Sequence, residues 1–451
     1  MAKKNTKTQP AARQILDMNA FDAETSASTS SPLLQRRIAN VGASAVLFYR
    51  EPLEMVSASG SWMTAADGKR YLDFYNNVPS VGHTHPRVVA AVTDQISKLN
   101  INSRYLSSVV DLYLDALKAT FPASLSNVVL SCSGSEANDL ALRIAAATSR
   151  GTGIIVSENA YHGNTSIISD ISPSALKRRK LPDHVVTVPA PSHAGQSGSI
   201  ENAFAADMTR AIAELERRGH KFSAFICDSI FSSDGVYADP PGFLRKAVEI
   251  VHKAGGLYIA DEVQPGFART GEAFWGFARH GVVPDVVTMG KPMGNGFPMA
   301  GLTTRPDLLA RFCEDTGYFS TFGANPVAAA AGMAVLNVIH DEQLQDNALR
   351  QGKHITARLL DLAAKDDRIA EIRGAGLFLG IELCRPGQKE QPDAELASSV
   401  INGLKDRGVL IGAAGRFGNT LKVRPPLSLT EQEADIFVDR LEEALSAIAA
   451  T

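Results

Sequence analysis

The sequence predicts an α/β fold with two parts: a large domain with a mostly parallel sheet flanked by helices, and a smaller α+β domain. From about residue 86 onward, helical patterns alternate with short apolar runs, which is the pattern of βαβ units and a parallel sheet. The chain has 451 residues, of which 45% are hydrophobic and 21% are charged. These values are ordinary for globular proteins, and the length corresponds to about two to three domains.

The first 85 residues precede this alternating region. Residues 1–30 are polar and predict an N-terminal arm, either mobile or lying along the surface. Within residues 31–85, the segment 45–75 predicts short strands separated by a turn at 66–69. We expect residues 31–85 to contribute to the small domain.

Residues 86–330 are predicted to form the large domain. A helix over 86–99 begins with Pro86, which suits a first helical turn. A second helix, over 136–147, follows the apolar run at 128–130. Further strands are expected at 153–156, 185–188, 224–227, 257–260, 286–289 and 300–303. Ligands of such sheets bind at the carboxyl ends of the strands.

Residues 331–451 are predicted to form a connecting helix and the rest of the small domain. An Ala-rich helical stretch extends from Asn325-Pro326 to about residue 363, and strands follow at 371–373, 377–383 and 420–423. The longest nearly apolar run covers 327–339, about 13 residues, which is too short to span a bilayer. We therefore expect no membrane partner.

Charge and cysteine content exclude further classes. Lys and Arg total 45 against 48 Asp and Glu, a net charge of −3, so no basic excess predicts nucleic-acid binding. Cys132, Cys227, Cys313 and Cys384 are far apart and form no CxxC pair, which argues against a disulfide framework and against a zinc or other metal site. With no secretory signal, these features favour a cytoplasmic location.

Three segments at predicted strand ends carry polar groups suited to chemistry. Ser133, Gly134 and Ser135 lie between an apolar strand and a helix, where N–H groups and hydroxyls bind phosphate; the alternative is an ordinary Ser-capped turn. Asp261 ends a strand, where a carboxylate holds a metal, acts as a base, pairs with a cationic ring, or is simply solvated. Lys291 ends another strand amid Gly and Pro; it is either a candidate Schiff-base former or a turn lysine.

The spacing of these segments favours one cofactor. Asp261 and Lys291 are 30 residues apart, about one βαβ unit. Together with the serine turn they provide a phosphate cradle, a carboxylate and an amine. Pyridoxal 5′-phosphate requires this set: an anchor for its phosphate, an acid partner for its pyridinium nitrogen and a lysine for its aldehyde.

Several motifs resemble those of the class III pyridoxal-phosphate-dependent aminotransferases, which have fold type I. They are SGSEANDLALRIA, AYHGN, ADEVQPGFARTG, PDVVTMGKPMGNGFPMAG and TFGANP. The resemblance covers about residues 45 to 445. It implies that Lys291 forms the Schiff base with the cofactor and that Asp261 pairs with the pyridinium nitrogen.

The same resemblance assigns the other cofactor contacts. Val263 matches the residue packed on one ring face, Tyr161 matches the aromatic residue stacked on the other face, and Gln264 matches the partner of the ring hydroxyl. Ser133, Gly134 and Ser135 match the phosphate cradle. Thr321 matches a residue that reaches the phosphate of the neighbouring subunit's cofactor, which implies a homodimer with shared active sites.

Within the family, the chain is most similar to the phospho-lyases that act on O-phosphoethanolamine and related phosphorylated amines. The similar segments are 76–78, 81–86, 99–106 and 289–296. This similarity implies elimination of phosphate to give an aldehyde, ammonia and phosphate. An ω- or alanine–glyoxylate-type aminotransferase is the alternative. A non-catalytic cofactor-binding relative is a third reading, which the presence of the lysine, the carboxylate and the cradle disfavours.

Position 233 favours the lyase. Many class III aminotransferases carry a Glu, in a stretch like Glu-Pro-x-x-Gly-Glu, that masks the carboxylate-binding arginine during one half-reaction. Here residues 228–235 read DSIFSSDG, and Ser233 stands at the masking position. Asp234 is adjacent, but a regular backbone would direct it elsewhere. An unmasked arginine suits a substrate that always brings an anion.

A basic pocket is predicted for that anion. Arg424 matches the carboxylate-binding arginine of the family, and Lys422 shares one face of a predicted strand with it. Arg104 and Arg416 are expected to join from neighbouring loops, because guanidinium groups suit a phosphate dianion. The alternative is that Arg104 and Arg416 are surface or interface charges.

Overall fold

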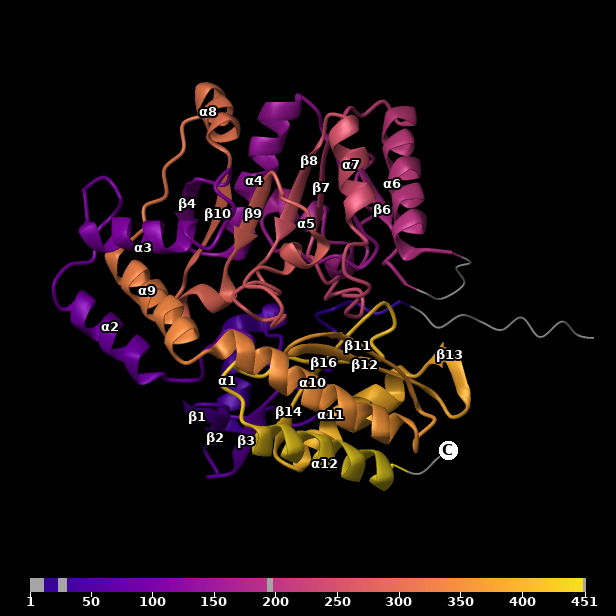
Figure 1. The fold of residues 1–451 in the computed structure, drawn as a ribbon. Coiled ribbons are helices and arrows are strands. Elements are labelled where there is room, and N and C mark those ends of the chain that lie inside the picture. Colours follow the sequence, from indigo (N-terminus) through magenta and orange to yellow (C-terminus); the bar gives the residue numbers. More distant parts are fainter. Residues whose placement is uncertain (1–11, 23–30, 193–197, 449–451) are drawn as a thin grey trace, which may run out of the picture.

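A computed structural model describes residues 12–22, 31–192 and 198–448. The middle of the chain forms a large unit, and the N-terminal strands together with the C-terminal part form a smaller unit beside it (Figure 1). This is the mixed α/β architecture that the sequence predicts. Of the predicted N-terminal arm, residues 1–11 and 23–30 lie outside the described residues.

A seven-stranded sheet forms the centre of the large unit, in the order β4-β10-β9-β8-β7-β5-β6. Neighbouring strands from β9 to β6 pair in parallel, whereas β10 is antiparallel to both of its neighbours. These strands are β4 (Asn127–Ser131), β5 (Gly153–Ser157), β6 (Val185–Val188), β7 (Phe222–Cys227), β8 (Leu257–Asp261), β9 (Val286–Met289) and β10 (Ala300–Thr304). Most of them are buried along their whole length, because helices cover the sheet.

The helices of the large unit are amphipathic or apolar and pack on this sheet or on one another. They are α2 (Pro86–Ile96), α3 (Ser108–Lys118), α4 (Gly134–Ser149), α5 (Ser166–Asp170), α6 (Ile200–Arg217), α7 (Arg245–Lys253), α8 (Pro306–Asp315) and α9 (Pro326–Asp341). Helix α4 lies across the sheet strands, and α2 and α3 pack on α9. No helix in the described part of the chain is long and apolar enough to cross a membrane.

The connection between β8 and β9 differs from the predicted βαβ unit. The strands are parallel neighbours, but their link contains only the 3-10 helix η3 (Gly276–His280). Glycines at positive φ, such as Gly271 at 73°, interrupt any regular helix there. Buried aromatic side chains of this link, including Phe267 and Trp275, fill the core instead.

The smaller unit joins segments from both ends of the chain. Strand β3 pairs in parallel with β14, which brings Leu72 opposite Val409. One sheet has the order β1-β2-β3-β14 and a second has β11-β12-β16-β15, with β13 beside β12. The strands are β1 (Met55–Ser59), β2 (Trp62–Ala65), β3 (Arg70–Asp73), β11 (Ile369–Ala375), β12 (Phe378–Arg385), β13 (Gln388–Pro392), β14 (Val409–Leu410), β15 (Gly412–Ala414) and β16 (Thr420–Val423).

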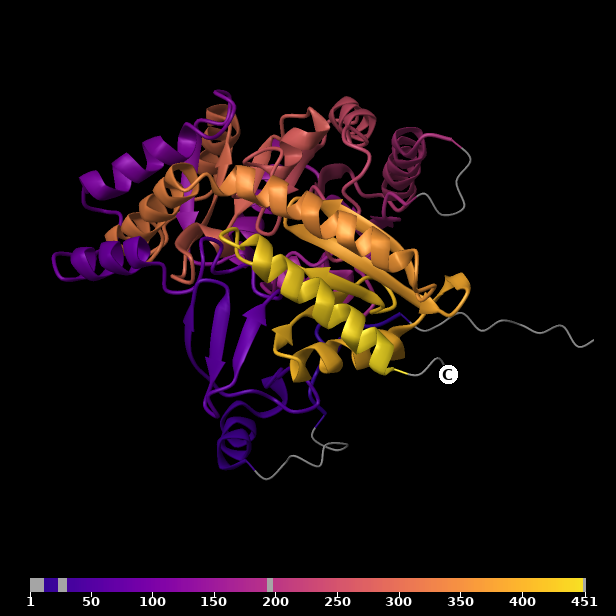
Figure 2. The ribbon, with the colours of Figure 1, turned by 60° about the horizontal axis from the view of Figure 1, so that its bottom comes forward.

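Helices α1 (Pro32–Val41), α10 (Leu344–Ala363), α11 (Ala394–Asp406) and α12 (Glu431–Ala447) complete the smaller unit. Helices α10 and α12 lie side by side (Figure 2). The predicted single helical stretch from residue 326 to 363 is in fact two helices, α9 and α10. The chain breaks between them at Gln343, whose φ of 51° is left-handed and therefore cannot continue an α-helix.

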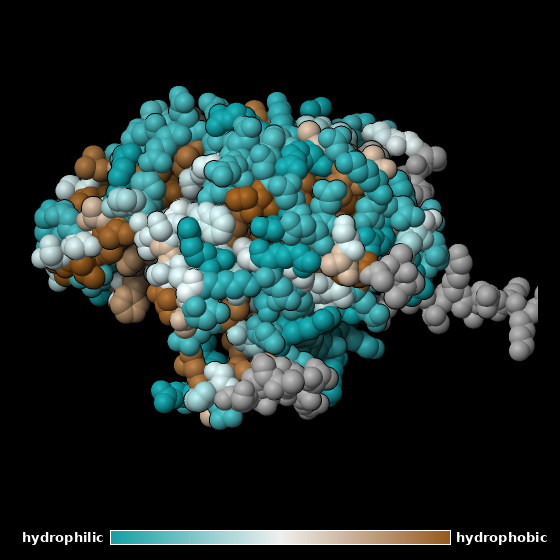
Figure 3. Space-filling view, turned by 90° about the horizontal axis from the view of Figure 1, so that it is seen from below, coloured by the Kyte–Doolittle hydropathy of each residue, from teal (hydrophilic) through white to brown (hydrophobic). Residues whose placement is uncertain are grey.

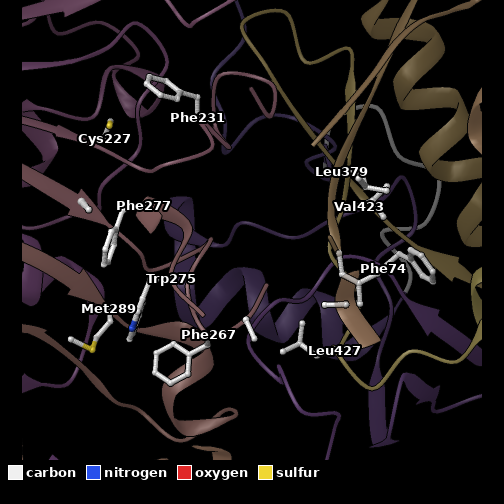
Figure 4. Packing of buried hydrophobic residues seen from close by; sticks show 14 of the residues in the cluster. Phe74, Cys227, Phe231, Phe267, Trp275, Phe277, Met289, Leu379, Val423 and Leu427 are labelled. Carbon is white, nitrogen blue, oxygen red and sulfur yellow. The ribbon is translucent and has the colours of Figure 1, made fainter. Parts of the chain in front are cut away.

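One hydrophobic core joins the two units. Figure 4 shows Trp275 and Met289 of the large unit in the same cluster as Phe74, Leu379 and Val423 of the smaller one. The two units therefore pack together through shared apolar contacts. The carboxyl ends of the large sheet's strands consequently have a fixed position relative to the smaller unit.

Candidate active site

A cavity of about 370 Å³ opens at the carboxyl ends of the parallel strands, where ligands of such sheets bind. Its walls come from the segments after β4, β5, β7, β8 and β9. It is lined by Val78, Cys132, Ser133, Gly134, Ser135, Asn138, Tyr161, His162, Gly163, Asp228, Asp261, Val263, Gln264, Lys291, Gly296, Phe297, Pro298 and Met299. All the predicted cofactor contacts except Thr321 are in this set.

The carboxylate of Asp261 is held in one orientation. Asp261 is the last residue of β8, and its Oδ2 lies 2.7 Å from His162 Nδ1 and accepts a hydrogen bond from Asn138 Nδ2 at 3.0 Å. Thr288 Oγ1 donates to Asn138 Oδ1 at 2.6 Å, which fixes the amide. The site therefore presents a buried carboxylate in a fixed position, as a cationic ring nitrogen requires.

Lys291 begins the 3-10 helix η4 (Lys291–Gly294), directly after β9. Its side chain faces the open cavity and is exposed to it, while the protein around the amine desolvates it and lowers the pKa of Lys291 to about 8. Asp261 opposes the shift, whereas the positive charge of Arg424 adds to it. The backbone φ of Lys291 is 24°, an uncommon value for a residue with a side chain.

The serine turn forms the start of the 16-residue helix α4. Ser133 is the N-cap, and Glu136 completes a capping box by accepting hydrogen bonds from the N–H groups of Cys132 and Ser133 at 2.7 and 3.2 Å. The N–H groups of Gly134 and Ser135 belong to the first helical turn, which has no intrahelical acceptors for them. These groups are suited to bind a phosphate.

Two glycines allow this turn to pack closely against the rest of the site. A Cβ on Gly163 would stand 2.3 Å from Ser135 Oγ, and a Cβ on Gly134 would stand 3.0 Å from Val263 Cγ2. Asn164 N also donates to Ser135 Oγ at 3.1 Å. The cradle, the carboxylate and the lysine thus meet in one cavity, and this set of groups fits pyridoxal 5′-phosphate.

Arg424 lies behind Gln264, and the carboxylate of Asp73 is near enough to attract it. Its Nη1 donates to Gln264 Oε1 at 2.9 Å, and its guanidinium stands 4.9 Å from the ring centre of Tyr75. Gln264 Nε2 in turn donates to Ser232 Oγ at 3.0 Å. Among the described residues, no carboxylate forms an ion pair with Arg424. This buried cation is therefore hydrogen-bonded to neutral amides, Gln264 at 2.9 Å and Asn77 at 3.4 Å.

The two residues at and beside the predicted masking position do not contact Arg424. Ser233 is buried and carries no charge. Asp234 accepts hydrogen bonds from Ser157 Oγ at 2.6 Å and from Asn159 N at 2.9 Å. Burial raises the pKa of Asp234 to about 7. The Asp234 side chain is thus hydrogen-bonded to the end of β5 and to the segment that follows it.

The four predicted substrate residues fall into two groups. Lys422 and Arg424 are buried beside the cavity. Arg104 is exposed, with its guanidinium 4.3 Å from the ring centre of Phe319, and the exposed Arg416 pairs with Glu158 at 3.2 Å. The structure therefore brings only the first two together, and substrate binding by Arg104 and Arg416 stays a prediction. Exposed Thr321 lies outside the cavity of its own chain.

Sequence reasoning named no role for several residues that line the cavity. Asn138 and His162 stand inside the motifs SGSEAND and AYHGN, but only their contacts with Asp261 show what they do. Asp228 directly follows β7, so its position at a strand end could have predicted that it lines the cavity. No feature of the sequence could have predicted this for residues 297–299.

Known proteins share this arrangement along most of the chain. A family model described as "Aminotransferase class-III" matches residues 48–445. "Alanine--glyoxylate aminotransferase 2 homolog 2, mitochondrial" of Arabidopsis thaliana is 37% identical over 420 residues, covering 92% of this chain and 87% of that protein. "Ethanolamine-phosphate phospho-lyase homolog 1" of Caenorhabditis elegans is 34% identical, covering 92% and 93%.

A solved structure agrees with these relatives. A phospholyase from Arthrobacter, in complex with phosphoethanolamine, is 42% identical with a TM-score of 0.89, and the match covers 92% of this chain and all of that one. This likeness confirms the predicted fold type. Together with the groups in the cavity, these relatives identify the cofactor as pyridoxal 5′-phosphate.

The first prediction concerns the covalent attachment point. Borohydride treatment of the purified yellow enzyme is expected to fix pyridoxal phosphate on Lys291, because this is the lysine that lines the cavity beside Asp261. Peptide mapping measures the position of the adduct. Lys291→Ala should yield no cavity adduct, whereas Lys253→Ala, at the end of α7, should label normally. An adduct on another lysine in the wild-type enzyme would refute the assignment.

The second prediction concerns pH. Cofactor capture by the apoenzyme needs the neutral amine of Lys291, whose pKa is lowered to about 8. The capture rate should therefore rise about tenfold per pH unit up to about pH 8 and then level off. Stopped-flow absorbance measures this rate. A lysine-containing peptide serves as control, and its rate should keep rising toward about pH 10.4. A plateau only in that higher range would contradict the lowered pKa.

Proposed function

This chain belongs to the class III aminotransferase family, and from that premise we propose that it is a phospho-lyase. Its reaction is the elimination of phosphate from O-phosphoethanolamine or a related phosphorylated amine. Water then hydrolyses the enamine that remains, so the products are an aldehyde, ammonia and phosphate. The names of two relatives support this proposal: the phospholyase in complex with phosphoethanolamine and the phospho-lyase homolog of Caenorhabditis elegans. The observation that carries it is the environment of Arg424.

An aminotransferase binds two substrates of different charge in turn at one site, and a masking acid covers its arginine when the substrate lacks an anion. Arg424 here has a neutral hydrogen-bond partner, Gln264, and uncharged Ser233 occupies the position where a masking acid is expected. A buried guanidinium without a carboxylate is costly unless its ligand brings the negative charge. A substrate that is always phosphorylated meets this requirement.

The chain's own residues can support such an elimination. Bound pyridoxal phosphate supplies an electron sink for negative charge on the substrate carbon next to nitrogen. Asp261, oriented by His162 and Asn138, stabilises positive charge at the far end of the cavity. Lys291 Nζ, whose pKa is lowered to about 8, accepts the proton from that carbon. The bond between the adjacent carbon and the phosphate oxygen then breaks, and phosphate leaves with the electron pair.

An aminotransferase is the second candidate. It is favoured by the relatives named alanine–glyoxylate aminotransferases, which are 37% and 36% identical to this chain. The two functions differ in the fate of the amino group. A lyase releases it as ammonia and needs no acceptor, whereas an aminotransferase keeps it on the cofactor until a keto acid arrives.

We also propose that the enzyme is a homodimer in which Thr321 reaches the neighbouring active site. Large apolar side chains gather on the side formed by α2, α3 and nearby loops, and Figure 3 shows this side at the left. They include Ile96, Leu99, Tyr105, Leu106, Leu112, Phe319 and Phe322. Leu106 is 101% exposed and Phe322 is 72% exposed. Such a patch supports a subunit interface, and Thr321 is adjacent to it in sequence.

The third prediction tests the reaction. The holoenzyme is expected to release inorganic phosphate from O-phosphoethanolamine without any keto acid, and its spectrum should show no accumulation of pyridoxamine phosphate. A phosphate assay and absorbance spectra measure the two outcomes. Ethanolamine is the matched control and should bind far more weakly, because it leaves the basic pocket without an anion. Stoichiometric conversion to pyridoxamine phosphate, reversed by pyruvate or glyoxylate, would instead establish the aminotransferase.

The fourth prediction tests the missing acid. Ser233→Glu places a carboxylate at the masking position, where it should compete with the substrate phosphate for Arg424. The KM for O-phosphoethanolamine is expected to rise about tenfold or more, as for loss of a charge-assisted contact. Ser233→Gln has nearly the same volume without the charge, so it controls for crowding. Equal KM values for the two variants would show that charge at this position is irrelevant.

The fifth prediction tests the dimer. Phe322→Asp should convert the protein to monomers, because a charge within the apolar patch opposes its burial. Light scattering coupled to gel filtration measures the molecular mass. Val56→Asp, on an exposed strand position away from the patch, is the matched control and should leave the mass unchanged. A monomeric wild-type enzyme, or a dimer that survives the Phe322 change, would reject this interface.

A further inference from the structure

Ser232 lies between the cavity residue Gln264 and the carboxylate of Asp228. It is fully buried, in the segment that follows β7. Its hydroxyl oxygen accepts a hydrogen bond from Gln264 Nε2 at 3.0 Å. The same hydroxyl donates to Asp228 Oδ2 at 3.0 Å. Ser232 itself does not line the cavity, so it can act on a ligand only through these two neighbours.

The chemistry of the groups fixes the direction of each of these hydrogen bonds. A guanidinium has only donors, so the atom of Gln264 that faces Arg424 Nη1 at 2.9 Å is the amide oxygen. The amino group of Gln264 therefore faces Ser232, whose oxygen accepts the bond. The single hydroxyl proton of Ser232 is then left for Asp228. Guanidinium, amide, hydroxyl and carboxylate thus form one chain of hydrogen bonds that leads from a cation to an anion.

The carboxylate of Asp228 is suited to end this chain as an acceptor. Its Oδ1 accepts from the N–H groups of Ile230 and Ser232 at 3.1 and 2.9 Å. Its Oδ2 accepts from the N–H group and the hydroxyl of Ser232, both at 3.0 Å. Burial raises the pKa of Asp228, and the hydrogen bonds from the two N–H groups oppose this shift because they stabilise the charged form. Both oxygens are therefore engaged as acceptors.

This chain determines which group Gln264 can present to a ligand. Its amide oxygen is directed to Arg424, and one Nε2 proton is directed to Ser232. The second Nε2 proton remains, and Gln264 lines the cavity together with Lys291. Gln264 is therefore set to meet a ligand in the cavity as a hydrogen-bond donor.

We infer that Ser232 is a positioning residue for Gln264, and that its hydroxyl holds the amide so that Nε2 donates to the ring oxygen of bound pyridoxal phosphate. The resemblance to the family assigns Gln264 to that oxygen, and the hydrogen bonds identify the group that sets the orientation of the amide. A donor at this oxygen stabilises its negative charge. The inference concerns the cofactor, so it applies equally to a lyase and to an aminotransferase.

The absorbance of the bound cofactor tests this role without any turnover. A donor that stabilises negative charge on the ring oxygen lowers the pH midpoint at which the cofactor changes its absorbance. Ser232→Ala should therefore raise this midpoint by about 0.5–1 pH unit, the equivalent of one lost hydrogen bond. Absorbance titration of the holoenzyme measures the shift. An unchanged midpoint in a folded Ser232→Ala enzyme would refute the positioning role.

Cofactor affinity provides a second measurement on the same variant. Ser232→Ala should weaken the binding of pyridoxal phosphate to the apoenzyme about two- to tenfold, because the amide donor is no longer held in place. Fluorescence titration of the apoenzyme measures the dissociation constant, and thermal unfolding identifies a variant that is misfolded. An affinity equal to that of the wild type would contradict the inference.

Ser233→Ala is the matched control for both measurements. Ser233 is the adjacent buried serine, and its hydroxyl has no hydrogen-bond partner among the residues that the structure describes. Its removal should leave the pH midpoint and the cofactor affinity unchanged. Equal effects of the Ser232 and Ser233 changes would show that the conformation of this turn matters and that the Ser232 hydroxyl does not.

A double-mutant cycle tests whether Ser232 acts through Gln264. Gln264→Ala should raise the midpoint at least as much as Ser232→Ala does. In the Gln264→Ala background, Ser232→Ala should cause no further shift, because the amide that it positions is absent. Additive shifts would overturn the inference. None of these outcomes depends on phosphate release from O-phosphoethanolamine, so this inference and the proposed function can fail independently.

Discussion

Asp261 stands opposite Thr288 in the parallel pairing of β8 with β9, and the placement of Lys291 relative to this carboxylate depends on that register. The pairing puts the carboxylate at the end of one strand and Lys291 just beyond the end of the next. Thr288 also holds the Asn138 amide that donates to Asp261. A slip of the two strands would therefore separate the lysine from its acid and remove the support of that acid at the same time.

The distribution of charged side chains around the cavity determines which kind of ligand the site can bind. Asp261 offsets the lysine within the cavity, so the cofactor end of the site contains opposite charges. Behind Gln264 the balance is different, because Arg424 is hydrogen-bonded to a neutral amide and forms no ion pair with a carboxylate among the described residues. The site thus has one half with paired charges and one half with an unpaired guanidinium. This asymmetry orients a ligand that has an amine at one end and an anion at the other.

The sequence predicts a functional residue best where that residue stands at the end of a strand or directly after it. Lys291 and Asp261 could be assigned because apolar runs define the strand ends, and the resemblance to the family then named their roles. The contact of Arg424 with Gln264 could not be predicted by local patterns, because 160 residues separate the two along the chain. Helical periodicity does not predict the irregular link between β8 and β9, because its glycines and buried aromatic residues interrupt a regular helix. It also does not predict the break at Gln343, because a single left-handed residue ends the helix there.

The backbone of Lys291 has a further consequence for natural variation. Its φ of 24° is a conformation that glycine adopts freely and other residues adopt at a cost of about 1–3 kcal/mol. A glycine at this position would remove the amine that we expect to hold the cofactor and would at the same time relax the main chain. The residue that we propose as the reactive one is thus also one that a purely structural selection would replace. A screen that selects only for thermostability and does not measure turnover would be expected to favour inactive variants with glycine in place of Lys291.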